Sequence, residues 1–92
     1  MYIRHYTKAF KKSIRKLDKS GNFNRAKVES IVTLLSKGKG LSQQYKDHAL
    51  KGEWLGYREC HLEPDLLLIY TIQENILILL LVDIGSHSQL FG

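Results

Sequence analysis

Two strand-length apolar segments in the C-terminal part of the chain constrain the fold most. Residues 66–72 and 76–82 are rich in Leu and Ile, and the polar stretch 73–75 separates them. Near-continuous apolar character is typical of strands that are buried on both faces. A membrane helix needs about 20 continuous apolar residues, so the sequence predicts two central strands joined by a short turn and no contact with a membrane.

Two further alternating segments complete the predicted sheet. Residues 2–6 and 54–63 alternate in the way that strands do, and Pro64 followed by Asp65 favours a tight turn. In the second segment His61 would lie on the face opposite Cys60, which we expect to be a small buried apolar residue. Residues 41–53 are polar and irregular and predict a loop. Consecutive strands with short turns predict an antiparallel meander of about four strands.

Two amphipathic helices are predicted between the first strand and the meander. Thr7 can cap a helix that ends at Ser20-Gly21, and Asn24 can cap a second helix that carries the apolar stripe 28–35. We expect the two helices to form an antiparallel hairpin on one face of the sheet. The predicted class is therefore α+β, in a single domain spanning residues 1–92.

Positive charge is concentrated in the N-terminal half of the chain. The formal net charge is +5, and no Lys or Arg follows Arg58. A basic surface suits nucleic acid or an acidic protein partner, although an ordinary solvated helix face explains it equally well. With one cysteine no internal disulfide can form. With no signal peptide expected either, we predict a cytoplasmic protein.

Three histidines and one acid lie near the predicted strand ends. His48 is in the loop before the second half of the sheet, His61 is near the end of a strand, Asp65 is in the next turn, and His87 follows the last strand. Strand ends in a meander can converge, and histidine transfers protons near neutral pH. Each residue alone is more often solvated or part of a turn. The four could also ligate zinc, but their spacing matches no compact zinc motif.

Several motifs in order resemble one known family. The segments 47–52, 56–65, 67–70 and 85–91, together with Trp54, resemble the YafQ-type toxins of the RelE/ParE superfamily of bacterial toxin–antitoxin systems. The resemblance spans essentially the whole chain. It implies a RelE-like fold, ribosome-dependent cleavage of mRNA, and silencing by a cognate antitoxin. It also implies that no metal or other cofactor is needed, because the RNA 2′-hydroxyl is the nucleophile.

The resemblance also assigns site residues. The counterparts of His48, His61, Asp65, His87 and Phe91 belong to the active site of the family. We expect His87 to be the general acid, and Asp65 or His61 the base with His48 assisting. Phe91 could stack on an RNA base or anchor the tail of the chain on the core.

Two positions depart from the family pattern. Asp83 stands where an arginine is common, and Leu66 stands where an aromatic residue often follows the acid. The loss of a phosphate clamp costs roughly a hundredfold or more in rate, and Lys46, Lys51 or Arg58 would have to supply the missing cation to the RNA.

The departures keep other functions open. A catalytically weak or inactive toxin-fold protein could act as an antitoxin-binding partner and transcriptional co-repressor. A toxin directed at gyrase is disfavoured, because an inhibitor needs no acid/base set. We expect the free toxin to be a monomer.

Overall fold

Five strands form one mixed, mostly antiparallel sheet in the computed structural model, which describes residues 1–92. The strands are β1 (Ile3–Tyr6), β2 (His48–Ala49), β3 (Arg58–Glu63), β4 (Leu66–Gln73) and β5 (Ile78–Gly85). Their order across the sheet is β1-β5-β4-β3-β2, and only β1, which pairs with β5, runs parallel to its neighbour. The α+β class is confirmed, with five strands in place of the expected four or so.

The two apolar segments form the centre of the sheet, as predicted. β4 lies between β3 and β5, and its residues 67–70 are buried. β5 begins at Ile78, two residues later than expected. The delay arises because residues 74–76 form a 3-10 turn and Leu77 ends that turn in the left-handed conformation, with φ 55°.

Both predicted helices form and both predicted caps are present. In α1 (Lys8–Ser20) the Thr7 hydroxyl accepts the Phe10 amide N–H at 3.0 Å. In α2 (Arg25–Ser36) the Asn24 side chain accepts the Lys27 N–H at 3.2 Å. Side chains of this kind satisfy amides that the first turn of a helix leaves without partners. None of the helices is long and apolar enough to span a membrane.

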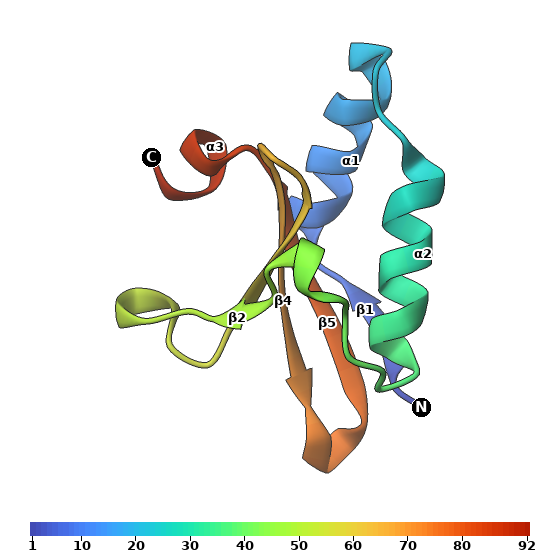
Figure 1. Ribbon diagram of the computed structural model, residues 1–92, viewed down its shortest axis with the longest axis vertical. Helices are drawn as coiled ribbons and strands as arrows, with labels where there is room; N and C mark the ends of the chain where they lie inside the picture. The colour runs from blue at the N-terminus through green and yellow to red at the C-terminus, as the bar shows by residue number, and fades with distance from the viewer.

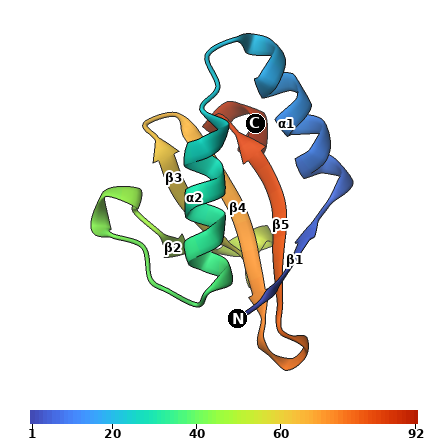
Figure 2. The same cartoon turned by 90° about the vertical axis from the view of Figure 1, so that its right-hand side faces the viewer.

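α1 and α2 cover one face of the sheet (Figures 1 and 2). Phe10 and Ile14 from α1 and the α2 stripe pack on side chains from β3, β4 and β5. The sheet side of this core consists of Cys60, Leu62, Leu68, Tyr70, Leu79, Leu81 and Ile84. Burial of a Leu side chain contributes about 1.5–3 kcal/mol, so this interface provides most of the stabilisation of the fold.

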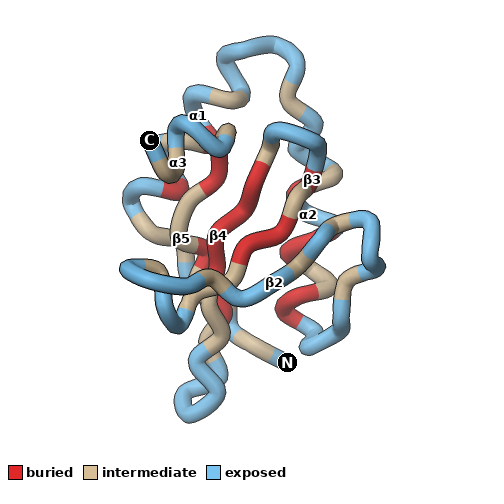
Figure 3. Tube along the Cα trace, turned by 60° about the vertical axis from the view of Figure 1, so that its left-hand side comes forward, coloured by how far each residue is buried: buried red, intermediate tan, exposed pale blue.

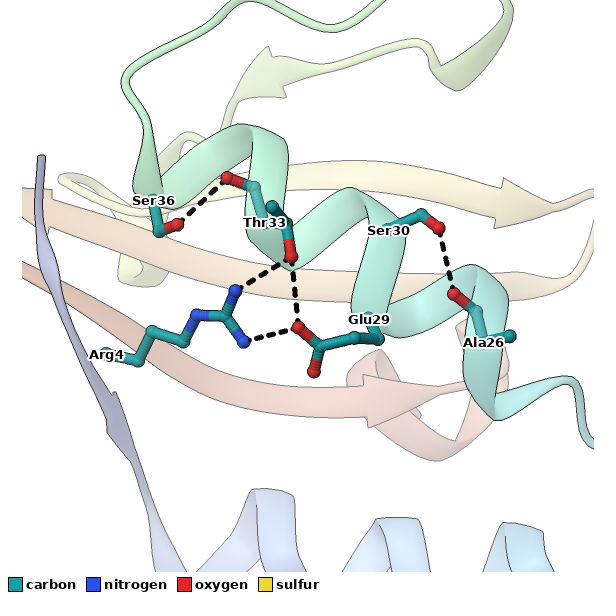
Figure 4. Close-up of polar contacts among 6 residues, drawn as sticks. All are labelled: Arg4, Ala26, Glu29, Ser30, Thr33 and Ser36. Atoms are coloured by element: carbon teal, nitrogen blue, oxygen red, sulfur yellow. Dashed lines mark hydrogen bonds and ion pairs between the residues drawn. The ribbon is translucent and has the colours of Figure 1, made fainter.

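Arg4 links the edge strand β1 to α2 (Figure 4). Its guanidinium lies 2.6 Å from Glu29 Oε2 and donates to the Thr33 hydroxyl at 2.8 Å, and that hydroxyl donates to Glu29 at 3.0 Å. The hydrogen bonds from Arg4 and Thr33 lower the pKa of Glu29. The contact attaches the edge of the sheet to the helical layer.

The opposite face carries two elements that the sequence interpretation missed. The expected loop 41–53 contains a 3-10 turn at Gln43–Tyr45 and the short strand β2, and a second 3-10 turn, η2 (Gly52–Trp54), follows. The expected tail is a helix, α3 (His87–Phe91). α3 and the part of the loop from β2 through η2 lie on the side of the sheet away from α1 and α2 (Figure 1), and the buried parts of the central strands are visible between them (Figure 3). The first part of the loop packs on the helix-covered core through Leu41 and Tyr45.

Local hydrogen bonds explain both differences. The Ser86 hydroxyl accepts the Gln89 N–H at 3.2 Å, and the Ser86 N–H donates to the Gln89 side chain at 2.8 Å, which is a complete capping box. Residues 52–54 form η2, and Gly56 has a left-handed φ of 97°, so neither segment is extended as a strand would be. The strand predicted over 54–63 therefore begins only at Arg58.

Candidate active site

His48 and His61 lie together on the face away from α1 and α2. His48 is the register partner of Glu59 in the β2–β3 pair, and His61 lies two positions after Glu59 on β3. Partners in a ladder, and residues two apart on one strand, direct their side chains to the same face. The two imidazole rings are 6.2 Å apart between centroids.

Glu59 is the acidic partner of this pair of histidines. Its Oε1 atom lies 3.0 Å from His61 Nε2, and its side chain is only 8% exposed. A buried carboxylate is costly unless a donor or cation accompanies it, so the Glu59–His61 contact fixes the orientation of both groups. Glu59 is a functional candidate that the sequence pattern alone does not single out, although strand alternation places it on the same face as His61.

The backbone beside His48 defines which ring nitrogen is free. His48 Nδ1 is 2.6 Å from the Lys46 carbonyl oxygen. Because a carbonyl oxygen only accepts, Nδ1 carries the proton, and Nε2 of the neutral ring is left as an acceptor. Lys46 has the left-handed φ of 49°, which turns its carbonyl toward the ring that follows.

α3 forms the other flank of the site. The Asp65 carboxylate accepts the His87 backbone N–H at 3.2 Å, so the β3–β4 turn contacts the first residue of the helix. The His87 and Phe91 rings are 5.1 Å apart, and the Phe91 ring meets Trp54 of η2 edge to face at 5.7 Å. Asp65 and His87 therefore lie together, and Phe91 packs between His87 and the loop.

The sheet register relates the two flanks. His61 pairs with Leu67, and Leu67 pairs with Gly85, which lies two positions before the first residue of α3. Neighbouring strands are spaced by about 4.8 Å, so the two flanks begin roughly 10 Å apart. Leu67 and Ile69, at most 1% exposed, lie between them as an apolar floor. A Cβ atom at Gly85 would come within 2.8 Å of Gln89 Oε1, so a side chain there would displace that oxygen from its hydrogen bond with the Ser86 N–H.

Two charged residues with predicted roles lie outside this cluster. Arg58 faces the side of Cys60, where its Nε is 3.3 Å from the Asp47 carboxylate, so the structure does not bring it to the histidines. Asp83 lies at the β5 bulge, and its carboxylate accepts from the Ser13 hydroxyl at 2.6 Å and from the Ile84 N–H at 2.8 Å. The carboxylate therefore contacts α1.

The two candidate lysines lie at the periphery of the site. Lys46 and His61 line the same hollow of about 420 Å³, together with Tyr45 and Lys27 from α2. Lys51 is exposed at the start of η2 and forms no ion pair. Cys60 is fully buried, as predicted, and burial raises the pKa of its thiol to about 12, which makes it a poor nucleophile.

No three His, Cys, Asp or Glu side chains of the site are grouped so that they could hold a metal ion. Glu59 contacts Nε2 of His61, and a backbone carbonyl contacts Nδ1 of His48. The arrangement instead offers two histidines beside a carboxylate, facing a third histidine across an apolar floor, which is suited to proton transfer.

Comparisons with known proteins agree with this architecture. A family described as "Bacterial toxin of type II toxin-antitoxin system, YafQ" matches residues 2–92. The mRNA interferase toxin YafQ of Escherichia coli K12 is 36% identical over 88 residues, covering 95% of this chain and 92% of the relative.

Solved structures extend the match to three dimensions. A metal-bound toxin from Helicobacter pylori is 42% identical with a TM-score of 0.92, covering 99% of this chain and all of the other. YafQ in the Escherichia coli DinJ–YafQ complex is 34% identical with a TM-score of 0.86, and each chain is fully covered. The chain therefore belongs to the YafQ family of bacterial toxins of type II toxin–antitoxin systems.

Proposed function

We propose that this toxin is an endoribonuclease that cleaves mRNA on translating ribosomes and is neutralised by a cognate antitoxin. The observation that supports the proposal is that His48 lies beside His61 and Asp65 lies beside His87, on two flanks that the strand register relates. The activity itself is named for the relative from Escherichia coli. A basic domain with acid/base groups suits a polyanionic substrate.

The proposed reaction uses the RNA as its own nucleophile. A base takes the 2′-hydroxyl proton, the 2′-oxygen attacks the adjacent phosphorus, and the bond to the 5′-oxygen breaks. An acid gives its proton to that leaving oxygen. The products are a 2′,3′-cyclic phosphate and a free 5′-hydroxyl, so neither water nor a metal enters the cleavage step.

The contacts favour His48 as the base. Its Nε2 is free to accept a proton. The Asp65 carboxylate accepts an N–H of α3, and Glu59 contacts Nε2 of His61. Asp65 or His61 as the base, with His48 assisting, is the alternative assignment. His61, oriented by Glu59, is then placed to donate to the phosphate, where stabilisation of developing charge contributes most.

The α3 flank supplies the acid and a stacking surface. His87 protonates the leaving oxygen, and positioned acids and bases of this kind each contribute roughly 10²–10⁴-fold in rate. The half-buried Phe91 ring beside it offers an edge or face to an RNA base. Lys46 and Lys51 are proposed to hold neighbouring phosphates.

Asp83 supports a second candidate function. Position 83 provides no cation, and Arg58 lies on the other face of the sheet. A weak or inactive toxin that acts through its antitoxin as a co-repressor remains the alternative. Asp83→Arg should raise cleavage if the missing cation limits the rate, and unchanged cleavage would show that it does not.

The basic face of α1 supports a protein partner. Lys8, Lys11, Lys12, Arg15, Lys16 and Lys19 are all exposed. A YafQ from Escherichia coli forms a complex with the antitoxin DinJ. We propose that an acidic or amphipathic antitoxin segment binds this chain as well, and that the free toxin is a cytoplasmic monomer, where mRNA and ribosomes are available.

Primer extension on mRNA with translating ribosomes tests the enzymatic proposal. We expect cuts with the wild type and a loss of at least roughly a hundredfold with His87→Ala. Equal cleavage by both proteins would remove His87 from the mechanism. Cleavage by neither would favour the binding protein, and cuts on naked RNA of equal rate would remove the ribosome dependence.

A further inference from the structure

We propose that Asp47 is a positioning residue, which clamps the turn 46–48 to the helix-covered side of the sheet so that His48 presents Nε2 to the RNA. The contacts that hold Asp47 and His48 do not depend on any reaction. Their consequence for RNA cleavage rests on the proposed function. Asp47 touches no reacting atom in this proposal and acts only through its neighbour.

Asp47 is held from two sides. Its Oδ1 atom accepts from the Tyr70 hydroxyl at 2.6 Å and lies 3.3 Å from Arg58 Nε. Tyr70 is 1% exposed and belongs to the core beneath α1 and α2. The Asp47 side chain is 21% exposed, so the loop carries a mostly buried, charge-assisted anchor.

The anchor and His48 point in opposite directions. Consecutive residues of an extended chain place their side chains on opposite faces. With the Asp47 carboxylate fixed against Tyr70 on one face, the His48 ring must project from the other, where it lies 6.2 Å from His61 between ring centroids. One side chain thus sets the position of the next.

Little else holds this turn. β2 has only two residues, and both are exposed. One further ladder bond, from Leu50 N–H to Tyr57 O at 2.9 Å, continues the pairing. Lys46 adopts φ 49°, a conformation that costs a non-glycine residue about 1–3 kcal/mol and persists only when its surroundings impose it. The Lys46 N–H, which donates to the Gln43 carbonyl at 3.0 Å, closes the preceding 3-10 turn on one side of this residue. The Asp47 clamp fixes the chain on the other side.

The turn also determines the tautomer of His48. The neutral histidine side chain in water carries its proton mainly on Nε2. Here the proton stays on Nδ1 instead, because Nδ1–H donates to the Lys46 carbonyl 2.6 Å away, and Nε2 becomes the acceptor. If the turn is released, that carbonyl moves away and the free-solution tautomer, which cannot accept a proton at Nε2, returns.

The clamp explains why Arg58 lies apart from the histidines. Its guanidinium accompanies the Asp47 charge on the helix-covered side, and the phenol of Tyr70 completes the set. Burial and the hydrogen bond to Asp47 raise the pKa of Tyr70, so its hydroxyl stays a donor throughout the neutral range.

Imidazole ¹⁵N NMR of the full chain, at a pH where His48 is neutral, tests the inference independently of cleavage. The variants are Tyr70→Phe, Asp47→Ala and the conservative Asp47→Asn. Tyr2→Phe is the matched control, because it removes a tyrosine–carboxylate hydrogen bond of 2.7 Å, to Glu74, elsewhere on the sheet. Thermal unfolding checks that each variant is folded.

We expect Nδ1–H in the wild type and in Tyr2→Phe, and a shift toward Nε2–H in Tyr70→Phe and Asp47→Ala. Asp47→Asn keeps an acceptor oxygen and should be intermediate. Cleavage kcat should fall roughly tenfold or more with the tautomer shift while KM changes little. A folded Tyr70→Phe that retains Nδ1–H overturns the clamp. A wild type that shows the tautomer but cuts no RNA leaves the clamp intact and rejects only the proposed function.

Discussion

The two flanks of the site are held in place by different means. His48 and His61 belong to strands that are paired to the centre of the sheet, and Glu59 and Asp47 attach them to buried groups. His87 and Phe91 belong to a five-residue helix that contains no buried residue. That helix is held by its capping box, by Asp65 and by the ring contact with Trp54.

The difference indicates which flank can move. Segments with few buried contacts open locally at a free energy far below that of global unfolding. We therefore expect α3 to detach and return while the β2–β3 flank stays ordered. A site of this kind can admit a bulky RNA strand from the α3 side without disturbing the histidine pair.

The largest expected effect is a difference in the free energy of unfolding between a core substitution and a substitution in α3. Leu68 is fully buried under the helices, and Leu68→Ala should lower the free energy of unfolding by about 2–5 kcal/mol, because it leaves a cavity. Leu90→Ala on α3 should cost less than about 1 kcal/mol, since that side chain is only half-buried. Urea titrations measure both, and equal losses would refute the distinction.

Glu59→Gln tests the ordered flank without changing its shape. The amide keeps the size of the side chain but removes the charge beside His61. We expect cleavage to fall roughly tenfold, in line with the loss of a partner that orients a catalytic histidine. The midpoint of urea unfolding should hardly change. An unchanged cleavage rate would show that the Glu59–His61 contact is only structural.

Ser86→Ala tests the mobile flank. Loss of the cap should lower the stability of α3 by about 1 kcal/mol and leave the stability of the rest of the fold unchanged. Amide exchange within α3 should quicken about fivefold while exchange in β4 is unaffected. Ser42→Ala is the control, because Ser42 precedes a 3-10 turn and makes no side-chain capping bond. Two outcomes in the variant would contradict local opening. One is faster exchange of the β4 amides together with the α3 amides, and the other is slower exchange of both.

The smallest expected effect lies away from both flanks. Arg4 lowers the pKa of Glu29, so the contact stabilises the fold above the ordinary carboxyl pKa and loses its effect as pH falls through the lowered value. Both groups are partly exposed, and the contribution should stay within about 1 kcal/mol. The difference in stability between wild type and Arg4→Met should therefore shrink on acidification below pH 4.5. Glu29→Gln, which has no such titration, should abolish that pH dependence.

Local signals made most of the fold predictable. Thr7 and Asn24 cap their helices as expected, and the central strands follow from their apolar runs. β2 and α3 were missed because two and five residues are too short for periodicity to register. The Ser86–Gln89 spacing was nevertheless a readable capping signal.

The candidate residues of the site could be predicted from the sequence more readily than the contacts between them. The placement of His48, His61, Asp65 and His87 near strand ends anticipated that they could meet on one side of the sheet. The contacts of Asp47 with Tyr70 and of Asp83 with Ser13 join residues far apart in the chain. Spacing in the sequence carries no information on such pairs, which depend on the register and on the bulge in β5.

The parallel pairing of β1 with β5 has a consequence for the order of folding. Thr7, at the end of β1, donates to the Val82 carbonyl across 75 positions of the chain. Closing so long a loop is slow, because its entropy is lost before the contacts are gained. During synthesis β1 must wait until β5, the last strand in the chain, has emerged, so the sheet is completed only after all of its strands exist. We expect substitutions in β1 to accelerate unfolding while leaving the folding rate almost unchanged. Stopped-flow kinetics of Tyr6→Ala would measure this, because Tyr6 pairs with Leu81 of β5 and packs against the core.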